Sequence, residues 1–457
     1  MGRQVERLAR FAAETLWENL PNTVQRHAKL VLLDTLGVML AGAGREEVRK
    51  LRTQLLRTQL VPDYGSGATV LAPGWPRSDT RTAALLNGIA GRSIELCEGH
   101  RLVSSQAAMQ ILPGVLAVGE QARSSGRELL SALVLGYDVA SRLCRAFTAR
   151  PLAHQNGQAT MLGAAAAGAR LPRLGASGVS LTMRIAATLL LTPSYTNVSV
   201  GATVLNVAGG MSCFAAALAP ELAIAGFEAQ DEAVEEALGK LVGNGFDPDV
   251  LLEELGTRWE ITQNYFRLYA CCNPIHPALD ALKEVIARLK PRSEEIDCID
   301  FATYRFASIM RNPEPPNYFA SKYSLPHAAA ALVVRGGVGH AELDDTALRD
   351  PKIVALRHRV RVTEDAAMSS VAPVKRPARV TVTLTDGRAD AEEVESHRGD
   401  FQQPFAEAEV RHKFRLLAGE ILSPDGVGII ERAVDHCEEW KSASELSELL
   451  RQPHVAA

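Results

Sequence analysis

The sequence predicts a mainly α-helical protein, with a large helical domain accompanied by a smaller α+β domain. Three observations support this fold class. Ala and Leu abound and aromatic residues make up only 5% of the 457 residues, which favours packed helices over sheet. The hydrophobic pattern is almost entirely helical up to about residue 242. Strand-like runs then alternate with helices, and a helical pattern returns from about residue 404.

The helices of the N-terminal part follow from periodicity and capping residues. Asn22 is placed to cap a helix that Gly42 closes. A short extended piece over 68–72 is followed by Asp79, which opens a helix over 80–90. Alanine-rich faces are expected to let neighbouring helices approach closely. Further helices are expected at 105–124, 127–147, 156–170, 180–191, 205–225 and 230–241.

Strand-like runs predict an α+β module in the middle of the chain. They occur at 296–308, 360–363 and 378–384, and the last run leads into a hairpin turn signal, Asp386-Gly387. A ligand site is expected where such a module meets the helical domain. Helices are expected at 277–290 and 320–336, and the domains over 1–245 (helical), 262–400 (α+β) and 404–457 (helical tail).

Composition excludes several classes of protein. The net charge is −4 and no basic block occurs, so a nucleic-acid surface is not expected. Two strongly apolar stretches, 159–169 and 211–219, are shorter than the roughly 20 residues that span a bilayer. The amino terminus is charged and amphipathic, unlike a secretory signal. Seven scattered cysteines fit a reducing compartment, so the chain is expected to be cytoplasmic.

The run RLYACCNPIHPALD at 267–280 gathers more chemical groups than any other stretch. It precedes a helix that begins near Pro277, where the positive end of the helix dipole favours an anion. Arg267 can clamp a substrate carboxylate with two hydrogen bonds. His276 and Asp280 are four residues apart, so an imidazole–carboxylate contact on one helix face is expected. In the alternative, purely structural interpretation, His276 caps the helix and both cysteines are packed apolar residues.

Three other segments carry candidate groups. Glu95 and Glu98 stand in a loop that ends at His100, where they could transfer protons or orient a substrate; the spacing matches no strong metal signature. His154 precedes an alanine-rich helix, which disfavours the cationic ring and leaves it able to accept a proton. Lys322 lies ahead of another helix and could hold an anion. Solvated carboxylates, a surface histidine and a helix cap are the corresponding structural alternatives.

Several short motifs occur in order along nearly the whole chain. They are LLDTLG at 32–37, ALLNG at 84–88, GRELL at 126–130, His154 ahead of GAA at 163–165, YACC at 269–272 with His276, SKYSLP at 321–326, and RPARV at 376–380 with DGR at 386–388. In their order and spacing these motifs resemble the MmgE/PrpD family, which includes 2-methylcitrate dehydratase, cis-aconitate decarboxylase and iminodisuccinate epimerase.

The resemblance implies a helical domain built from both ends of the chain, a smaller α+β lid domain and a cleft between them. It also implies a homodimer. Catalysis would need no metal and no organic cofactor, and the substrate would be a small carboxylic acid. Neither nucleic acid nor a membrane is expected as a partner.

The sequence departs from the family pattern at positions that matter for chemistry. The family segment His-x-Leu-Asp-Phe-Asp-Asp-Thr reads RSIELCEG at 92–99, where Glu95 and Glu98 stay acidic and Cys97 replaces an Asp. A family histidine falls at or beside Gln106 and is absent. A lysine and a histidine fall on Thr203 and Asn206. The substrate therefore carries fewer carboxylates, or the proton steps are assigned differently.

We therefore predict a cofactor-independent lyase, with dehydration of a small hydroxy-carboxylate as the first choice. An isomerase or epimerase of a dicarboxylate in the same cleft and a noncatalytic ligand-binding relative are the alternatives. A redox enzyme using Cys271 and Cys272 is disfavoured, because exchange motifs separate their cysteines by two residues. The expected catalytic residues are His154 for proton transfer, with Tyr269, Cys272 and His276 as further candidates. The expected substrate-binding residues are Arg267, Lys322, Glu95, Glu98 and Gln106.

Overall fold

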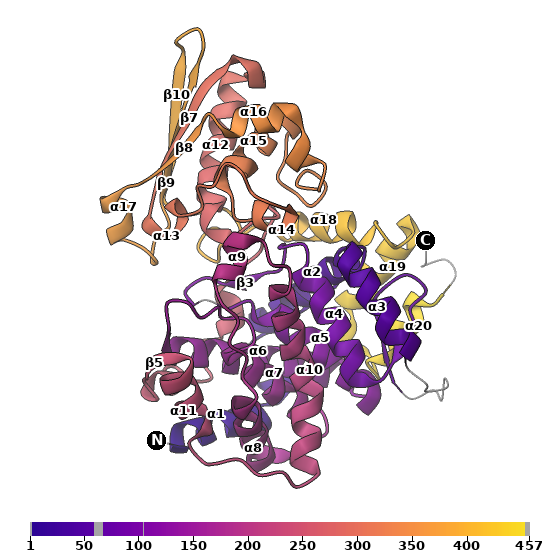
Figure 1. The fold of residues 1–457 in the computed structure, drawn as a ribbon. Coiled ribbons are helices and arrows are strands. Elements are labelled where there is room, and N and C mark those ends of the chain that lie inside the picture. Colours follow the sequence, from indigo (N-terminus) through magenta and orange to yellow (C-terminus); the bar gives the residue numbers. More distant parts are fainter. Residues whose placement is uncertain (1, 59–66, 104, 453–457) are drawn as a thin grey trace. The chain divides into compact units, whose positions relative to one another are not determined.

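The computed structural model describes residues 2–58, 67–103 and 105–452, so the last five residues of the expected C-terminal tail lie outside the described residues (Figure 1). The chain divides into two compact units. Unit 1 comprises Met1–Tyr195, Val204–Asn264 and Ala406–Ala457, and unit 2 comprises Thr196–Thr203 and Tyr265–Phe405. Helices dominate the described residues and the sheets are small, which confirms the mainly α fold class.

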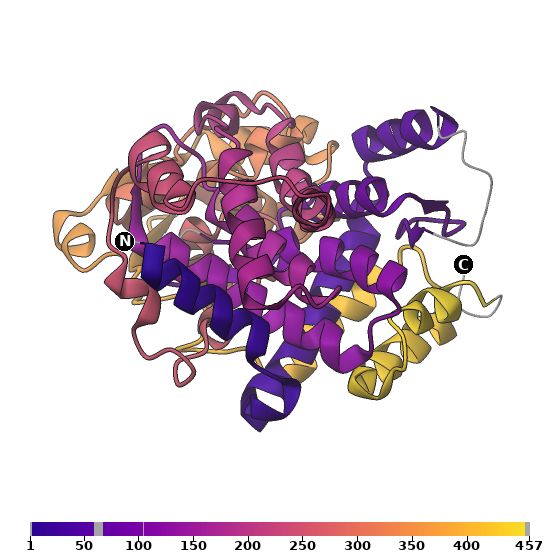
Figure 2. The same cartoon turned by 90° about the horizontal axis from the view of Figure 1, so that it is seen from below.

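Unit 1 is built from helices of both chain ends. Helix α18 (Glu407–Ala418) packs against α2 (Asn22–Gly42), and the yellow C-terminal helices lie beside the indigo and violet N-terminal ones (Figure 2). Unit 1 also contains two short antiparallel strand pairs, β1 (Ala68–Thr69) with β2 (Arg77–Ser78) and β4 (Phe147–Ala149) with β5 (Gly243–Phe246). Its helices are α1 (Gly2–Glu14), α2 (Asn22–Gly42), α3 (Glu46–Thr58), α4 (Thr80–Arg92), α5 (Ala107–Ala122), α6 (Gly126–Ala146), α7 (Ala159–Arg170), α8 (Gly175–Thr188), α10 (Leu205–Ile224), α11 (Ala233–Glu236), α18 (Glu407–Ala418), α19 (Pro424–Asp435) and α20 (Ser444–Leu450).

Local capping explains several helix starts. Asp79 accepts hydrogen bonds from the backbone N–H groups of Arg81 and Thr82, so the predicted cap of α4 is confirmed. The expectation for α2 is wrong in detail, because Asn22 is the first helical residue and Pro21 takes the capping position without a side-chain bond. The pyrrolidine ring of Pro21, at φ −56°, sets the direction in which the chain enters the helix.

Small residues allow the central helices of unit 1 to approach closely, as the alanine-rich faces predicted. A Cβ atom at Gly168 of α7 would lie only 1.8 Å from the carbonyl oxygen of Ala216 on α10. By length and composition alone, α10 could cross a membrane. It packs against α4, α5 and α7, however, so within unit 1 it is a core helix.

Unit 2 contains a four-stranded sheet in the order β10-β9-β7-β8, with β7 and β8 parallel and the other pairs antiparallel. Helices α12 and α15 pack against the sheet (Figure 1). The predicted hairpin joins β9 to β10, and Gly387 adopts the positive φ of +88° that this turn requires. The elements are β7 (Ile296–Thr303), β8 (Val360–Glu364), β9 (Ala378–Leu384), β10 (Ala389–Val394), α9 (Thr196–Val200), α12 (His276–Leu289), α13 (Arg305–Ser308), α14 (Tyr318–Ser321), α15 (Leu325–Arg335), α16 (Pro351–Arg357) and α17 (Ala366–Ser370).

Two elements of unit 2 are shorter than predicted. The strand expected over 296–308 ends at Thr303, because that residue is the last one paired with both β8 and β9. The helix expected over 320–336 is broken before α15. Ser324 caps α15 by accepting from the N–H of His327, and Pro326 in the first turn cannot continue a helix from the preceding residues.

Candidate active site

The predicted site residues form two clusters, one within each unit. The helical cluster of unit 1 contains Arg92, Glu95, Cys97, Glu98, Gln106 and His154. The α+β cluster of unit 2 contains Arg267, Tyr269, Cys271, Cys272, His276, Asp280, Lys322 and His397.

The turn after α4 carries Glu95 in an unusual backbone conformation. Its φ is +55°, a left-handed value that Gly or Asn normally supplies. The guanidinium of Arg92 donates to Glu95 Oε2 at 3.1 Å and to the sulfur of Cys97 at 3.0 Å. All three residues are buried. A non-glycine residue in this region costs of order 1–3 kcal/mol, and such strain is concentrated at functional sites.

Glu98 is fully buried and holds three donors. Its carboxyl accepts from the hydroxyl of Tyr137 at 2.8 Å, the N–H of Ala108 at 3.0 Å and the amide of Asn264 at 3.3 Å. The Ala108 contact lies in the first turn of α5, so Glu98 serves as the cap that the side chain of Gln106 does not provide. Burial raises the pKa of Glu98 to about 7.

A residue of the C-terminal segment fixes the same turn from another side. The ammonium group of Lys413 on α18 donates to the carbonyl oxygen of Leu96 at 2.7 Å and pairs with Asp34 of α2, also at 2.7 Å. Lys413 and Asp34 are 5% and 0% exposed. The residues from Glu95 to Glu98 are therefore held from four helices and from Asn264, and the turn is preorganised.

His100, at the end of this loop, belongs to a separate ionic network. Its Nε2 lies 2.8 Å from Glu260, whose carboxylate also accepts from Arg145 and Arg258. All four residues are in unit 1, and His100 and Glu260 are fully buried. Through Glu260 and Arg145, this network holds the segment before Asn264 against α6, so we assign it a structural role.

His154 is held as a neutral ring. Its Nδ1 accepts a hydrogen bond from the N–H of Asn156 at 3.2 Å, and the ring stacks on Tyr195 at a centroid distance of 5.3 Å. Burial, followed by the positive charge of Arg92, lowers the pKa of His154 to about 3. Because Nδ1 is the acceptor, the proton of the neutral ring resides on Nε2. His154 therefore offers an N–H donor, and it is a weaker base than the sequence predicted.

Buried carboxamides add hydrogen-bonding capacity to unit 1. Gln106, at the N-cap of α5, is 7% exposed, and its Oε1 has no hydrogen-bond partner among the described residues. Asn206, at the position of a family histidine, is 2% exposed, and its Oδ1 likewise meets no partner in the described ranges. Buried polar atoms of this kind are commonly satisfied by water or by a ligand.

In the α+β cluster, two donors converge on one backbone carbonyl. Arg267 Nη1 donates to the carbonyl oxygen of Cys271 at 3.3 Å, and His276 Nε2 reaches the same oxygen at 3.1 Å. A carbonyl only accepts, so His276 carries its proton on Nε2 and the lone pair of the neutral ring on Nδ1. Arg267 also donates to the hydroxyl of Tyr265 at 3.2 Å. Arg267 and His276 are 1% and 2% exposed.

The predicted partner of Asp280 is replaced by another one. Its carboxylate accepts from the hydroxyl of Tyr269 at 2.7 Å and from the N–H of Arg398 at 2.9 Å. Tyr269 reaches Asp280 because its ring lies edge-on to His276, with the centroids 5.2 Å apart. Burial and the adjacent carboxylate raise the pKa of Tyr269, so the phenol stays protonated and donates its hydrogen to Asp280.

Cys272 and Lys322 are brought together through the backbone. The N–H of Cys272 donates to the carbonyl oxygen of Lys322 at 2.8 Å. The ammonium group of Lys322 lies 4.1 Å from the centroid of the Tyr318 ring, a cation–π contact. Both residues are buried. The two motifs that carry the candidate cations of unit 2 thus lie side by side.

The sequence interpretation did not select His397, which lies in the α+β cluster. Its Nε2 accepts from the amide of Asn273 at 2.9 Å, and Arg376 donates to the amide oxygen of Asn273, which fixes that orientation. The ring of His397 stands edge-on to His276 at 5.5 Å. The contact between His397 and His276 joins residues far apart in the sequence, so local patterns do not predict it. Arg376, which orients Asn273 toward His397, belongs to the RPARV motif of the family resemblance.

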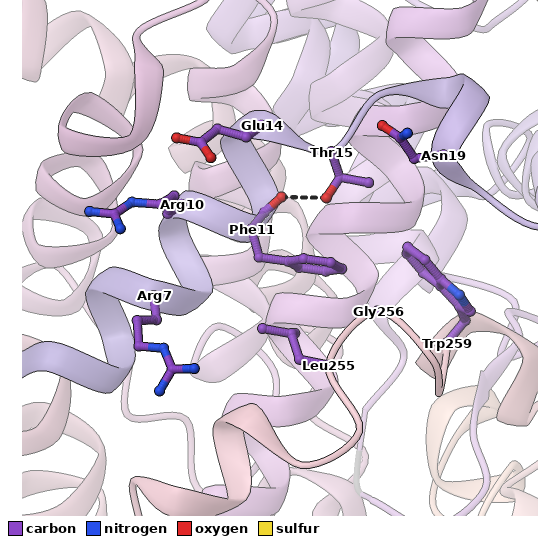
Figure 3. A pocket seen from close by; sticks show the side chains of 9 residues that line it. All are labelled: Arg7, Arg10, Phe11, Glu14, Thr15, Asn19, Leu255, Gly256 and Trp259. Carbon is purple, nitrogen blue, oxygen red and sulfur yellow. Dashed lines mark hydrogen bonds between the residues drawn. The ribbon is translucent and has the colours of Figure 1, made fainter.

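A surface hollow of about 450 Å³ lies elsewhere in unit 1 (Figure 3). The rings of Phe11 and Trp259 lie next to each other there, with centroids 5.7 Å apart. None of the predicted site residues lines this hollow. Its lining residues are Arg7, Arg10, Phe11, Glu14, Thr15, Asn19, Leu255, Gly256 and Trp259.

Comparison with known families agrees with this arrangement. Residues 6–248 match the model of the MmgE/PrpD N-terminal domain, and residues 269–439 match that of the MmgE/PrpD C-terminal domain. The chain belongs to the MmgE/PrpD family. The C-terminal match runs through α18 and α19, so this MmgE/PrpD chain matches the family in the segment that returns to unit 1 as well.

Characterised relatives cover nearly the whole chain at low identity. A cis-aconitate decarboxylase from Aspergillus terreus is 23% identical over 98% of this chain and 95% of its own length. The cis-aconitate decarboxylases of Mus musculus and Homo sapiens are each 23% identical, over 96% and 95% of this chain and 91% and 92% of their own lengths. The relatives are therefore lyases.

Two departures of this MmgE/PrpD chain from the family pattern are in contact with each other. Arg92 and Cys97, which stand where the pattern has a histidine and an aspartate, lie 3.0 Å apart. Gln106 and Asn206 are buried carboxamides at or beside positions of family histidines. The departures within unit 1 are therefore buried rather than on the surface.

Proposed function

We propose that this member of the MmgE/PrpD family is a cofactor-independent lyase that removes water from a small hydroxy-carboxylate. The observation that carries the proposal is the burial of two cations, Arg267 and Lys322, each about 1% exposed, beside imidazole and phenol groups. A buried guanidinium favours a carboxylate, which it can bind with two parallel hydrogen bonds.

The chemistry requires stabilisation of negative charge next to the substrate carboxylate. Removing a proton from the adjacent carbon places charge on the carboxyl oxygens, and preorganised donors stabilise that charge most in a dry site. Arg267 supplies such a donor. His154 supplies a neutral Nε2–H, since its ring does not take up a proton near neutral pH.

We assign the proton-accepting step to His276. Its Nε2–H is committed to the carbonyl oxygen of Cys271, so the Nδ1 lone pair is the one that can accept a carbon-bound proton. The C–O bond on the neighbouring carbon then breaks, and the hydroxyl leaves as water after it is protonated. Glu95 orients that hydroxyl group. Tyr269 and Cys272 remain candidates for the donor.

Decarboxylation is the second candidate, favoured by the cis-aconitate decarboxylases among the relatives. It shares the need for donors around a developing carbanion, but it releases carbon dioxide and needs no leaving hydroxyl. An isomerase would return the abstracted proton to the substrate without losing any group.

The test is to incubate the full chain with malate, citrate, 2-methylcitrate and cis-aconitate in heavy water. Proton NMR would follow deuterium exchange and alkene formation, and a gas assay would follow carbon dioxide. We expect loss of water, or its addition to cis-aconitate, in the wild-type protein and not in Arg267→Ala. Carbon dioxide release would favour the decarboxylase, and exchange alone the isomerase. Binding without any of these changes would indicate a ligand-binding relative.

A further inference from the structure

Arg92 is a buried cation whose surroundings are shaped to contain it. It ends α4, is 1% exposed, and its guanidinium spans two neighbours, Glu95 at 3.1 Å and Cys97 at 3.0 Å. Room for its side chain comes from α10, since a Cβ atom at Gly209 would lie 2.5 Å from Arg92 Cγ. A buried ion pair is weak evidence for stability, because desolvation offsets the attraction.

The backbone conformation of Glu95 adds a further free-energy cost to this buried ion pair. A turn that needs φ +55° would be less strained with glycine, yet the chain places a buried glutamate there, 3% exposed. A side chain kept at a strained and desolvated position is a candidate for function. The two contacts of the Arg92 guanidinium also explain why position 97 is a cysteine. An aspartate there would place a second carboxylate, beside that of Glu95, against the one guanidinium.

The two buried cations of this region each lie against a carboxylate. Arg92 lies against Glu95 and Lys413 against Asp34, while His154 is neutral. Gln106 and Asn206 add uncharged carboxamides. The pairing leaves no net positive charge to attract a carboxylate, whereas a carboxylate side chain accepts readily from a hydroxyl group.

We propose that Arg92 is a positioning residue that holds Glu95 in its strained turn, and that Glu95 so placed binds an uncharged hydroxyl group of the substrate. The second half of the proposal rests on the proposed function. The first half concerns only the chain's own geometry.

Crystal structures of Arg92→Met and Gly209→Ala test the first half. The methionine removes the guanidinium, and the alanine displaces it while the arginine stays in the sequence. We expect Glu95 to leave the left-handed region in both variants. A Glu95 that keeps φ near its present value, with its carboxylate in place, would overturn the positioning role. Arg81→Met, at a solvent-exposed arginine of the same helix, is the control.

Binding of malate and of succinate, which lacks the hydroxyl group, tests the second half by calorimetry on the full chain. We expect wild type to prefer malate about 10-fold or more, and Arg92→Met to lose the preference. Turnover of any substrate found should fall about 10²-fold in Arg92→Met, mainly in kcat, with partial recovery in Arg92→Lys.

The outcomes separate the two ideas. A preference for malate that survives in Arg92→Met, or equal binding of both acids to wild type, would overturn hydroxyl recognition. If wild type neither binds nor converts any acid, the proposed function and hydroxyl recognition both fail, and the crystal structures still decide the positioning role.

Discussion

Arg267 and His276 donate to the same acceptor, the backbone carbonyl oxygen of Cys271, at 3.3 and 3.1 Å. A candidate anion-binding cation and a candidate base are therefore oriented by one peptide group. Because the His276 bond fixes the tautomer, a shift of that peptide would alter both the position of the cation and the availability of Nδ1.

Replacement of Arg267 should impair catalysis more than folding. We expect Arg267→Ala to lower kcat/KM by at least about 10²–10³-fold, the usual effect of removing a preorganised donor. Arg267→Lys should also be impaired, because an ammonium group cannot contact the Cys271 carbonyl and the Tyr265 hydroxyl as a fork does. Steady-state kinetics and thermal melts would measure both effects. Unchanged turnover in both variants would remove Arg267 from the site.

His154 should act as a donor, and its effect on stability should depend on pH. Its pKa in the folded chain is about 3, below the ordinary value of 6.5, so between these values the unfolded chain binds a proton that the folded chain does not. Stability is therefore lost as pH falls below about 6.5. We expect the melting temperature of His154→Gln to fall less between pH 7 and pH 5 than that of wild type.

The same variant tests the tautomer. The carboxamide of glutamine can place an N–H near the position of the ring Nε2–H, so His154→Gln should retain more activity than His154→Ala. Equal activities, or a ¹⁵N spectrum showing the proton on Nδ1, would contradict the donor role.

Glu98 should show the opposite pH trend. Its pKa is raised from 4.5 to about 7, so the folded chain favours the protonated form, and the associated stability is lost as pH rises from about 4.5 through 7. Glutamine mimics the protonated carboxyl. The melting temperature of Glu98→Gln relative to wild type should thus increase from pH 5 to pH 8. The exposed Glu284→Gln is the control, and a matching trend there would refute the assignment.

Lys413 and Asp34 should behave as a coupled buried pair. Lys413→Met leaves a desolvated carboxylate behind, so we expect a loss of about 3–5 kcal/mol in the free energy of unfolding. Lys413→Met combined with Asp34→Leu should recover most of that loss. The exposed pair Lys50–Glu46 supplies the control, Lys50→Met, which should change stability by less than about 1 kcal/mol. Urea denaturation of wild type, Lys413→Met, Asp34→Leu, the double variant and the control measures these changes, and additive effects of the two single variants would exclude the coupling.

Local signals predicted much of the fold. The cap at Asp79, the strand over 378–384 and its glycine turn were all predicted from neighbouring residues, and each is present. The end of β7 at Thr303 was not, because it depends on where two partner strands stop pairing. The helix predicted over 320–336 begins only at Leu325, because Pro326 must lie in the first turn of a helix, whatever the apolar periodicity of the residues before it.

Side-chain type and the family resemblance identify the candidate residues, but the role of each residue depends on contacts that side-chain type alone does not predict. His154 was expected to accept a proton, and the N–H of Asn156 assigns it the donor tautomer instead. The importance of Arg92 depends on the space beside Gly209 and on the conformation of Glu95. His397 lies near His276 only because the chain returns after the sheet.

The bond from Lys413 to the carbonyl oxygen of Leu96 joins residues 317 positions apart. During translation the turn that contains Glu95 is synthesised long before Lys413, whose side chain binds to it. The turn can therefore take this hydrogen bond only after α18 has left the exit tunnel and docked against α2.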